Sequence, residues 1–286
     1  MQTDNAKKIY FLLIIGVTVI STSGILISLS TAAPLIIAFY RMFFSVLVMT
    51  PFVLFRYKNQ LGHFFNIKLV LVGAFLAVHF FLWNTAFEYT SIANAVIFIA
   101  LQPLFTYLLE YFFAKEDLRA GIISGIIFAL LGSIIISIGD MNTLFTKVWG
   151  DLLAIAAAFF AAAYLFTGRS LRRELEYFPF LYIIYTYACL FLGLMSLITR
   201  QSFSGFGNYN YIYFIGLALG PTLIGHSILN YSVRKVPATI VSLSILLEPV
   251  LTTVFAWILL GKGITWMTLV GGLLIIFGIY RAFTEL

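Results

Sequence analysis

The sequence predicts an all-α integral membrane protein with ten transmembrane helices, arranged as two inverted halves over residues 1–140 and 141–286, with both termini cytoplasmic. Three observations predict this fold. The 286-residue chain is 62% hydrophobic and 10% charged, whereas soluble domains are about 45–50% apolar and about 25% charged. Apolar stretches of membrane-spanning length recur from end to end. One pattern of polar and helix-breaking residues also occurs twice.

Each apolar stretch is long enough to cross a bilayer core as a helix, which takes about 20 residues. The stretches are continuous rather than alternating, so they favour helices over the strands of a β-barrel. Their connections are short, and almost no soluble domain is expected. The ten expected spans are 9–29, 34–56, 67–87, 91–113, 119–139, 150–169, 178–199, 210–231, 236–260 and 265–283.

A pattern around two prolines links the halves through a constant offset. Asn84 lies 19 residues before Pro103, and Asn230 lies 19 residues before Pro249. Each half contains five spans, an odd number, so the second half enters the membrane in the opposite orientation, as in the inverted repeats of secondary transporters. Glycines follow both prolines at matching steps of 22 and 29 residues, at Gly125 and Gly132 and again at Gly271 and Gly278.

Basic residues set the expected orientation. One set of loops carries thirteen of the seventeen Lys and Arg residues, and the opposite set carries only Lys147, Arg200 and Lys262. Because Lys and Arg concentrate on the cytoplasmic side, both termini are placed in the cytoplasm and the chain in the cell's inner (plasma) membrane. The formal charge of +6 is therefore assigned to orientation in the lipid bilayer and not to nucleic acid.

Two stretches carry a resemblance to a known family. They run from Leu101-Gln102-Pro103 through Gly125 and Gly132, and from Leu247-Glu248-Pro249 through Gly261, Gly271-Gly272 and Gly278. Both resemble the closing part of the EamA repeat of the drug/metabolite transporter superfamily, and Arg41 resembles an arginine often found in that family's second span. The resemblance covers nearly the whole chain. It implies a secondary transporter of small metabolites, with a central cavity lined mainly by spans 1, 3, 4, 6, 8 and 9.

The chain departs from that family pattern at one loop. The family often has an acidic residue after the glycine that ends the ninth span, whereas this chain has Gly261-Lys262-Gly263. The departure puts a salt bridge at this loop in doubt and leaves the expected fold unchanged.

Glu248 is the strongest candidate for a functional side chain. It lies near the middle of span 236–260, where a charge costs roughly 2.5–3.5 kcal/mol on insertion scales. Its carboxylate is suited to proton coupling or cation binding; the alternative is a neutral acid that bonds backbone groups freed by Pro249. Gln102 holds the equivalent place before Pro103, so the halves share the helix break and differ in charge.

Helical spacing adds neighbours to these two residues. Asn94, Phe98 and Gln102 are four apart and share one helix face, and Ser244 lies four residues before Glu248. Polar stripes on membrane helices face a cavity or other helices. Two roles fit these residues: they line a cavity, or they form hydrogen bonds between helices.

Two histidines also lie within expected spans. His79 belongs to span 67–87, and His226 lies four residues before Asn230 in span 210–231. A histidine in mid-membrane can relay protons, because it titrates near physiological pH. Hydrogen bonding to a neighbouring helix is the alternative for both.

An aromatic wall is a further expectation. Trp83, with Asn84 beside it, lies near the outer end of span 67–87. Trp83 is either an interfacial anchor or, if it faces inward, a stacking and cation–π surface. Tyr164 in span 150–169 would extend that surface.

Two charged residues leave several roles open. Arg41 lies within span 34–56, where it would bind a substrate carboxylate, extend to the outer surface or bond the carbonyls of a helix end. A structural role is favoured, because spans 2 and 7 are peripheral in the fold that the chain resembles. Glu110, near the cytoplasmic end of span 91–113, is expected to pair with Lys115 at the surface.

No enzyme motif or cofactor site is recognised. The sequence lacks a phosphate loop, a nucleophile elbow and a histidine pair at metal-ligand spacing, and its one cysteine, Cys189, excludes an intrachain disulfide. We therefore expect no cofactor, no metal and a monomer or weak dimer. The expected substrate-binding residues are Arg41, His79, Trp83, Asn84, Asn94, Phe98, Gln102, Tyr164, His226, Asn230, Ser244 and Glu248.

The expected function is secondary active transport by alternating access. The substrate is expected to be a small polar or amphipathic metabolite, with an amino acid or a related zwitterion or cation favoured, and to be exported, with proton coupling as one mechanism. A membrane enzyme or lipid-handling protein with Glu248 and a histidine as an acid–base pair, and a channel, are the alternatives.

Glu248→Gln is expected to reduce transport at neutral pH, because the amide has the shape of the carboxyl group but neither charge nor a titratable proton. Uptake into proteoliposomes across a pH series measures the effect. An unchanged rate together with an unchanged pH profile would contradict a functional role for this carboxylate.

Overall fold

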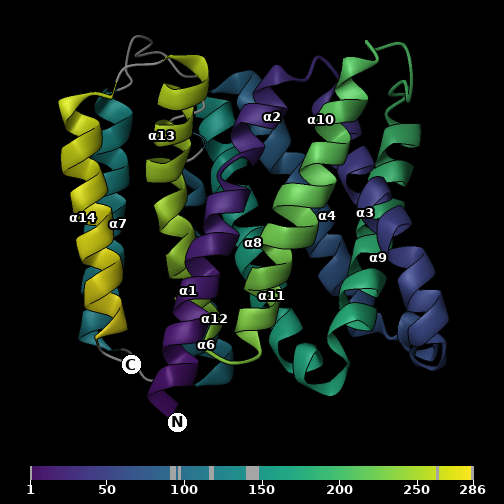
Figure 1. Cartoon of the computed structure of the whole chain (residues 1–286), viewed down its shortest axis with the longest axis horizontal. Helices are drawn as coiled ribbons and strands as arrows, with labels where there is room; N and C mark the ends of the chain where they lie inside the picture. Colours follow the sequence, from purple (N-terminus) through teal and green to yellow (C-terminus); the bar gives the residue numbers. More distant parts are fainter. Residues whose placement is uncertain are drawn as a thin grey trace.

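A computed structural model describes residues 2–90, 95, 98–115, 119–139, 148–261 and 264–284, and its regular elements within these ranges are all helical (Figure 1). Two shorter apolar helices cover Ala120–Ile135 and Leu269–Ala282. The all-helical class is confirmed, and the count of ten spans stays a prediction. Within the described residues, seven helical segments are long and apolar enough to cross a membrane: Lys8–Leu29, Pro34–Arg56, Ile67–Tyr89, Val148–Arg169, Tyr177–Ile198, Tyr209–Val233 and Ala238–Leu259.

The described helices lie along the expected spans, and residues 91–94, 96 and 97 of span 91–113 lie outside the described residues. In the first half they are α1 (Gln2–Ile20), α2 (Ser23–Leu29), α3 (Pro34–Arg56), the 3₁₀ helix η1 (Lys58–Phe65), α4 (Ile67–Tyr89), α6 (Gln102–Ala114) and α7 (Ala120–Gly139). In the second half they are α8 (Val148–Glu174), α9 (Tyr177–Ile198), α10 (Tyr209–Leu217), the π-helix η2 (Ala218–His226), α11 (Ser227–Val233), α12 (Ala238–Ser244), the 3₁₀ turn η3 (Ile245–Leu247), α13 (Glu248–Leu260) and α14 (Trp266–Phe283). The start of α1 and the end of α14 lie on the same side of the bundle (Figure 1).

Two spans are interrupted where a proline follows a polar residue. Helix α6 begins at Gln102 with Pro103 in its first turn, and α13 begins at Glu248 with Pro249 next. Proline lacks the N–H that would continue a preceding helix, and it is well tolerated at the first helical position. The helix break shared by the two halves is therefore confirmed.

The first span is also interrupted, at a turn between α1 and α2. Its hydroxyl groups satisfy nearby carbonyls: Ser21 donates to Val17 O at 2.8 Å, and Ser23 donates to Ile20 O at 2.6 Å. Such bonds allow a helix to break inside a membrane, where water cannot satisfy the freed backbone groups.

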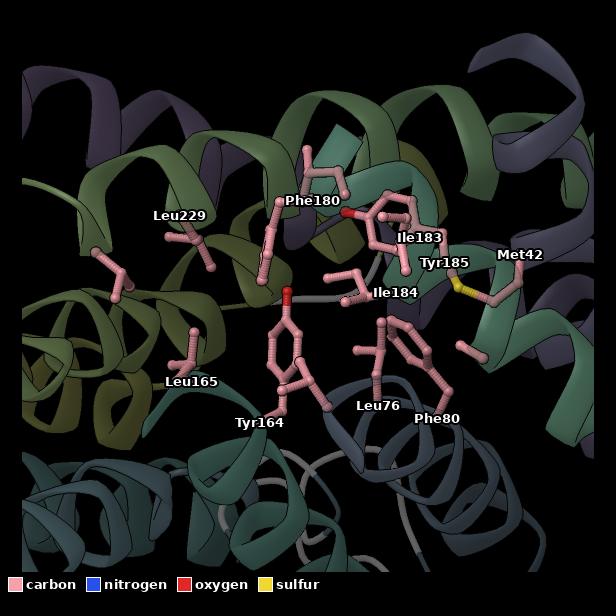
Figure 2. Packing of buried hydrophobic residues seen from close by; sticks show 14 of the residues in the cluster. Met42, Leu76, Phe80, Tyr164, Leu165, Phe180, Ile183, Ile184, Tyr185 and Leu229 are labelled. Atoms are coloured by element: carbon pink, nitrogen blue, oxygen red, sulfur yellow. The ribbon is translucent and has the colours of Figure 1, made fainter. Parts of the chain in front are cut away.

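The described helices pack with two peripheral pairs at opposite edges of the bundle. Helix α7 lies against α14 at one edge, and α3 lies against α9 at the other (Figure 1). Between them, α4 packs on α8, and α1 packs on η2 and α11. The largest apolar core lies where α3, α4, α8 and α9 meet, and Figure 2 shows Met42, Phe80 and Tyr185 directed into it.

Crossed glycine contacts join α7 to α14. A Cβ atom at Gly125 would lie 2.5 Å from the carbonyl oxygen of Gly278, and one at Gly132 would overlap the carbonyl oxygen of Gly271. Gly125 and Gly271 are 146 residues apart, as are Gly132 and Gly278. A two-fold axis between the helices would produce this reciprocal pairing, which supports the predicted inverted repeat.

Glu110 joins three helices, and the expected surface pair with Lys115 is wrong. The Glu110 side chain is 1% exposed, and its Oε1 lies 3.0 Å from Arg169 Nη1 of α8. Its carboxylate also accepts hydrogen bonds from Ala238 N at 3.0 Å and from the backbone N and hydroxyl of Thr239, at the start of α12. Glu110 thereby ties α6 to α8 and α12 at the end where the chain begins.

Gly125→Ala is expected to lower the melting temperature of the purified protein. Its Cβ would lie 2.5 Å from a carbonyl oxygen and 2.8 Å from Ala282 Cβ, and overpacking of this kind costs about 1–3 kcal/mol. Gly24→Ala is the matched control, because no atom lies within 4 Å of its added Cβ. Equal melting temperatures for the two variants would contradict close packing of α7 on α14.

Candidate functional site

A small buried cavity of about 30 Å³ lies where the interrupted helices meet. A water molecule needs roughly 10–15 Å³ of such space, so the cavity has the size of about two waters. An organic metabolite does not fit in this conformation. The cavity is lined by Ile20, Ser23, Arg41, His79, Phe80, Trp83, Ile99, Gln102, His226, Ile245 and Glu248.

Equivalent positions of the two halves meet in this cavity. Six of its lining residues form three pairs that are each 146 residues apart in the sequence. One apolar pair is identical in the two halves, whereas the members of each other pair differ in charge or in whether they titrate. The pairs are Ile99 with Ile245, Gln102 with Glu248, and Phe80 with His226.

Glu248 is the acidic residue of the cavity. Helix α13 begins at Glu248, after the 3₁₀ turn η3, and the side chain is 5% exposed. Within the described ranges its carboxylate makes no hydrogen bond, so the structure does not support bonding to backbone groups freed by Pro249. A buried carboxylate without a partner is costly to keep charged, and this carboxylate remains available to a proton or a ligand.

Arg41 supplies the positive side of the cavity. Its side chain is 1% exposed, so the alternative in which it extends to the outer surface is wrong. Its Nε donates to Thr222 Oγ1 at 2.6 Å, and its Cζ lies 4.1 Å from the centroid of the Phe80 ring. In the part of the chain that the structure describes, Arg41 Nη2 has no hydrogen-bond partner and no ion pair joins Arg41 to Glu248.

Helix α3 is peripheral, yet Arg41 reaches the centre through the unusual geometry of η2. This π-helix contains Pro221, which has no N–H to donate. Thr222 Oγ1 donates to Leu217 O, five residues earlier, at 2.8 Å. Its lone pairs then remain to accept from Arg41, so the hydroxyl fixes both the π-turn and the guanidinium.

Both histidine rings lie beside the Phe80 ring. His79 Nδ1 lies 2.9 Å from Ala157 O of α8, and because a carbonyl oxygen only accepts, this nitrogen carries a hydrogen. A neutral His79 would keep its Nε2 as an acceptor. The ring of His226 meets that of Phe80 edge-on, with centroids 5.5 Å apart. The expected bond from a histidine to a neighbouring helix is present for His79.

Trp83 faces inward. Its side chain is 4% exposed, and its ring packs edge-on against Phe87 with centroids 4.8 Å apart. The interfacial-anchor alternative is therefore wrong for Trp83. Together with Phe80 and the lining isoleucines, it gives the cavity an apolar wall beside its charged groups.

Several expected residues lie elsewhere. Tyr164 donates to Asn230 Oδ1 at 2.6 Å, which joins α8 to α11 inside the apolar core, where Figure 2 shows Tyr164. Asn84 Nδ2 donates to Pro34 O at 3.1 Å and binds α4 to the start of α3. Asn94 lies outside the described residues.

Ser244 and Phe98 do not line the cavity, because the helices change geometry before each proline. The 3₁₀ turn η3 separates Ser244 from Glu248, and Ser244 donates locally to Val241 O at 2.6 Å. Phe98 precedes the turn that leads into Gln102, and it packs in an apolar cluster. In both halves the isoleucine three residues before the polar residue lines the cavity instead.

Sequence reasoning missed Ser23, Phe80 and Thr222. The run Ser21-Thr22-Ser23-Gly24 in the middle of the first span was a signal for a helix break, because hydroxyl side chains compete for backbone groups. Pro221 was the equivalent signal beside Thr222. Nothing in the sequence marked Phe80 as a cavity residue except its position 146 residues before His226.

Comparisons with known proteins agree with this architecture. The model of the EamA-like transporter family matches residues 7–138 and 148–284. An uncharacterized transporter of Archaeoglobus fulgidus is 28% identical over 218 residues, which are 74% of this chain and 76% of that protein. The Bacillus subtilis uncharacterized transporter YdfC is 24% identical over 276 residues, which are 93% of this chain and 87% of that protein.

A solved crystal structure of a protein with 18% sequence identity has the same fold. It superposes with a TM-score of 0.82 over 98% of this chain and 97% of that chain. The two family matches together span most of the sequence, and the apolar helices are those of a multi-pass membrane protein. The chain belongs to the EamA-like transporter family.

Proposed function

We propose that this transporter carries a small zwitterion, such as an amino acid, across the inner membrane by alternating access, with the substrate held between Arg41 and Glu248. The observation that carries the proposal is the pair of buried, opposite charges that line one cavity without forming an ion pair within the described chain. A substrate carrying both an ammonium and a carboxylate group would complement them.

The charged groups suit the two ends of such a substrate differently. A guanidinium can bind a carboxylate through two parallel hydrogen bonds, and Arg41 Nη2 has no described partner in the empty protein. The Glu248 carboxylate would accept from the ammonium group. Because unpaired buried groups are unfavourable, ligand binding would recover interactions that the empty cavity lacks.

Movement of the helix ends would enlarge the site. The cavity of about 30 Å³ is too small for an amino acid, so the substrate-bound conformation must be wider. The breaks before Gln102 and Glu248, the turn after α1 and the π-helix η2 surround the cavity and offer positions for bending. Ten spans in two inverted repeats would let each half exchange its conformation with the other.

Proton coupling and export complete the proposal. Glu248 would release its proton when it binds the substrate ammonium group, and His79 and His226 line the same cavity. Export from the cytoplasm follows the family expectation. A monomer or weak dimer is the proposed transporting form.

Counterflow in proteoliposomes tests the proposal. We expect a trapped amino acid to drive uptake of the same labelled amino acid, and we expect analogues without the carboxylate or without the ammonium group to exchange poorly. Each lost charge-assisted hydrogen bond should cost about 1.5–3 kcal/mol, or roughly 10–100-fold in affinity. Arg41→Gln should abolish the preference for the carboxylate, and Glu248→Gln should abolish the preference for the ammonium group.

The same assay separates the alternatives. A channel would pass substrate without requiring exchange, and an enzyme would change the substrate chemically. Exchange of anions alone, with no response to zwitterions, would contradict the proposed roles of Arg41 and Glu248.

Thr222→Val is expected to raise the KM for the zwitterion about tenfold, because it removes the acceptor that orients Arg41 at 2.6 Å. Thr222→Ser should restore the KM, since serine keeps the hydroxyl group. Thr186→Val is the matched control, because its hydroxyl bonds only Tyr182 O within α9. A KM that stays unchanged in Thr222→Val while the melting temperature falls would assign Thr222 a purely structural role.

A further inference from the structure

A second and larger pocket lies on the outside of the bundle, away from the candidate functional site. Its volume is about 550 Å³, within the range of roughly 300–1,000 Å³ that is usual for ligand pockets. Its walls come from α1, α3, α9, η2 and α11, and side chains at its mouth are exposed, including Val48 at 50% and Ile224 at 49%. The pocket therefore opens on the surface that faces lipid.

The interior of this pocket suits a hydrocarbon chain. Leu12, Leu181 and Leu223 contribute apolar walls. The polar groups of Tyr177 and Ser227 already have partners within the protein. The Tyr177 hydroxyl donates to Ser227 O, and the Ser227 hydroxyl donates to Thr222 O at 3.4 Å. A polar ligand would lose its hydration in this pocket without gaining hydrogen bonds, which is unfavourable. An acyl chain has no polar groups to satisfy, so it does not carry this cost.

Three basic residues lie about one helical turn beyond residues that line the pocket. Lys8 precedes Leu12 by one turn of α1, Arg56 follows the lining residue Phe52 by four positions, and Arg234 follows Tyr231 by three. The start of α1 and the ends of α3 and α11, where these residues belong, lie at the same end of the bundle (Figure 1).

The charge at this end remains positive after nearby groups are considered. The Arg56 guanidinium lies 6.0 Å from the Tyr57 ring, and Arg234 Nη2 donates to Leu175 O at 2.9 Å. The nearest acidic residue in sequence to the wall is Glu176, which precedes α9 and accepts from Gln60 Nε2 at 2.6 Å. Among these four described residues the charge is net positive, which attracts an anionic group.

We infer that this pocket binds one anionic phospholipid, with an acyl chain between α1, α3, α9 and η2 and the phosphate beside Lys8, Arg56 and Arg234. The apolar walls fix the chain, and the basic rim selects the head group. Binding of the lipid is independent of the proposed transport function.

Lipid at this site would also contact the segment that orients the cavity. Leu223 and Ile224 belong to η2, the π-helix that also carries Thr222 and His226. An acyl chain against one face of η2 would favour the conformation in which Thr222 holds Arg41. This second effect rests on the proposed function, whereas the binding site does not.

Native mass spectrometry of the purified full chain tests the binding site. Phosphatidylglycerol and phosphatidylcholine with identical acyl chains are added separately, and we expect one molecule of phosphatidylglycerol to be retained preferentially. Removal of a basic side chain should weaken that preference about fivefold for each residue, so Arg56→Gln combined with Arg234→Gln should nearly abolish it. Soluble glycerol phosphate should not displace the lipid.

Val48→Trp places a larger side chain at the mouth and should prevent retention of the lipid. Leu194→Trp is the matched control, because Leu194 is also 54% exposed on α9 and lies outside the pocket. Equal retention of both lipids by the unaltered protein, displacement by glycerol phosphate, or retention by Val48→Trp would each overturn the inference.

The effect on transport has a separate readout. Exchange should be faster in liposomes that contain phosphatidylglycerol, and Val48→Trp should remove that stimulation while Leu194→Trp keeps it. Selective lipid retention without any exchange of zwitterions would uphold the lipid site and count against the proposed function alone.

Discussion

The whole structure depends on the hydrogen-bonding requirement of backbone groups in a membrane. A polar backbone group that leaves its helix must find another partner within the protein, because the bilayer core holds no water. Here the helices break near the cavity, where hydroxyl groups supply such partners. Ser21 and Ser23 bond carbonyls beside the turn after α1, and Thr222 bonds the carbonyl of Leu217 in the π-helix. The helix breaks and the polar cavity therefore occur together, because both depend on the same region of hydroxyl side chains.

The two halves of the sequence contribute different polar groups to the cavity. They supply Ile99 and Ile245 at equivalent positions, but Gln102 corresponds to Glu248. Arg41 has Tyr187 at the equivalent position of the second half, and the Tyr187 hydroxyl bonds Phe64 O, away from the cavity. Each half thus contributes one charge of opposite sign. A site with that polarity orients a dipolar ligand even when the surrounding helices are related by near symmetry.

The sequence predicted the elements whose signals are local. Long apolar runs predicted the helices, and the prolines at 103 and 249 predicted the breaks that place Gln102 and Glu248 in the cavity. Cavity lining by Ser244 and Phe98 was not supported, because a change of helical geometry rotates side chains away from the face that regular spacing assigns. The reach of Arg41 was hidden for another reason, since it depends on a hydroxyl 181 residues away in the chain. The family resemblance predicted the fold, whereas this long-range contact is visible only in the structure.

The polar contact among Glu110, Arg169 and Thr239 makes the two ends of the bundle unequal. It joins three helices at the end where the chain begins. The equivalent positions in the other copy of the repeat are Ser23 for Arg169 and Ala256 for Glu110, and neither can form an ion pair. Separation of the helices at the first end would expose a buried carboxylate and leave an arginine unpaired, which is costly. Opening of this end would therefore require the Glu110–Arg169 ion pair to break, whereas the equivalent positions of the other half impose no such requirement.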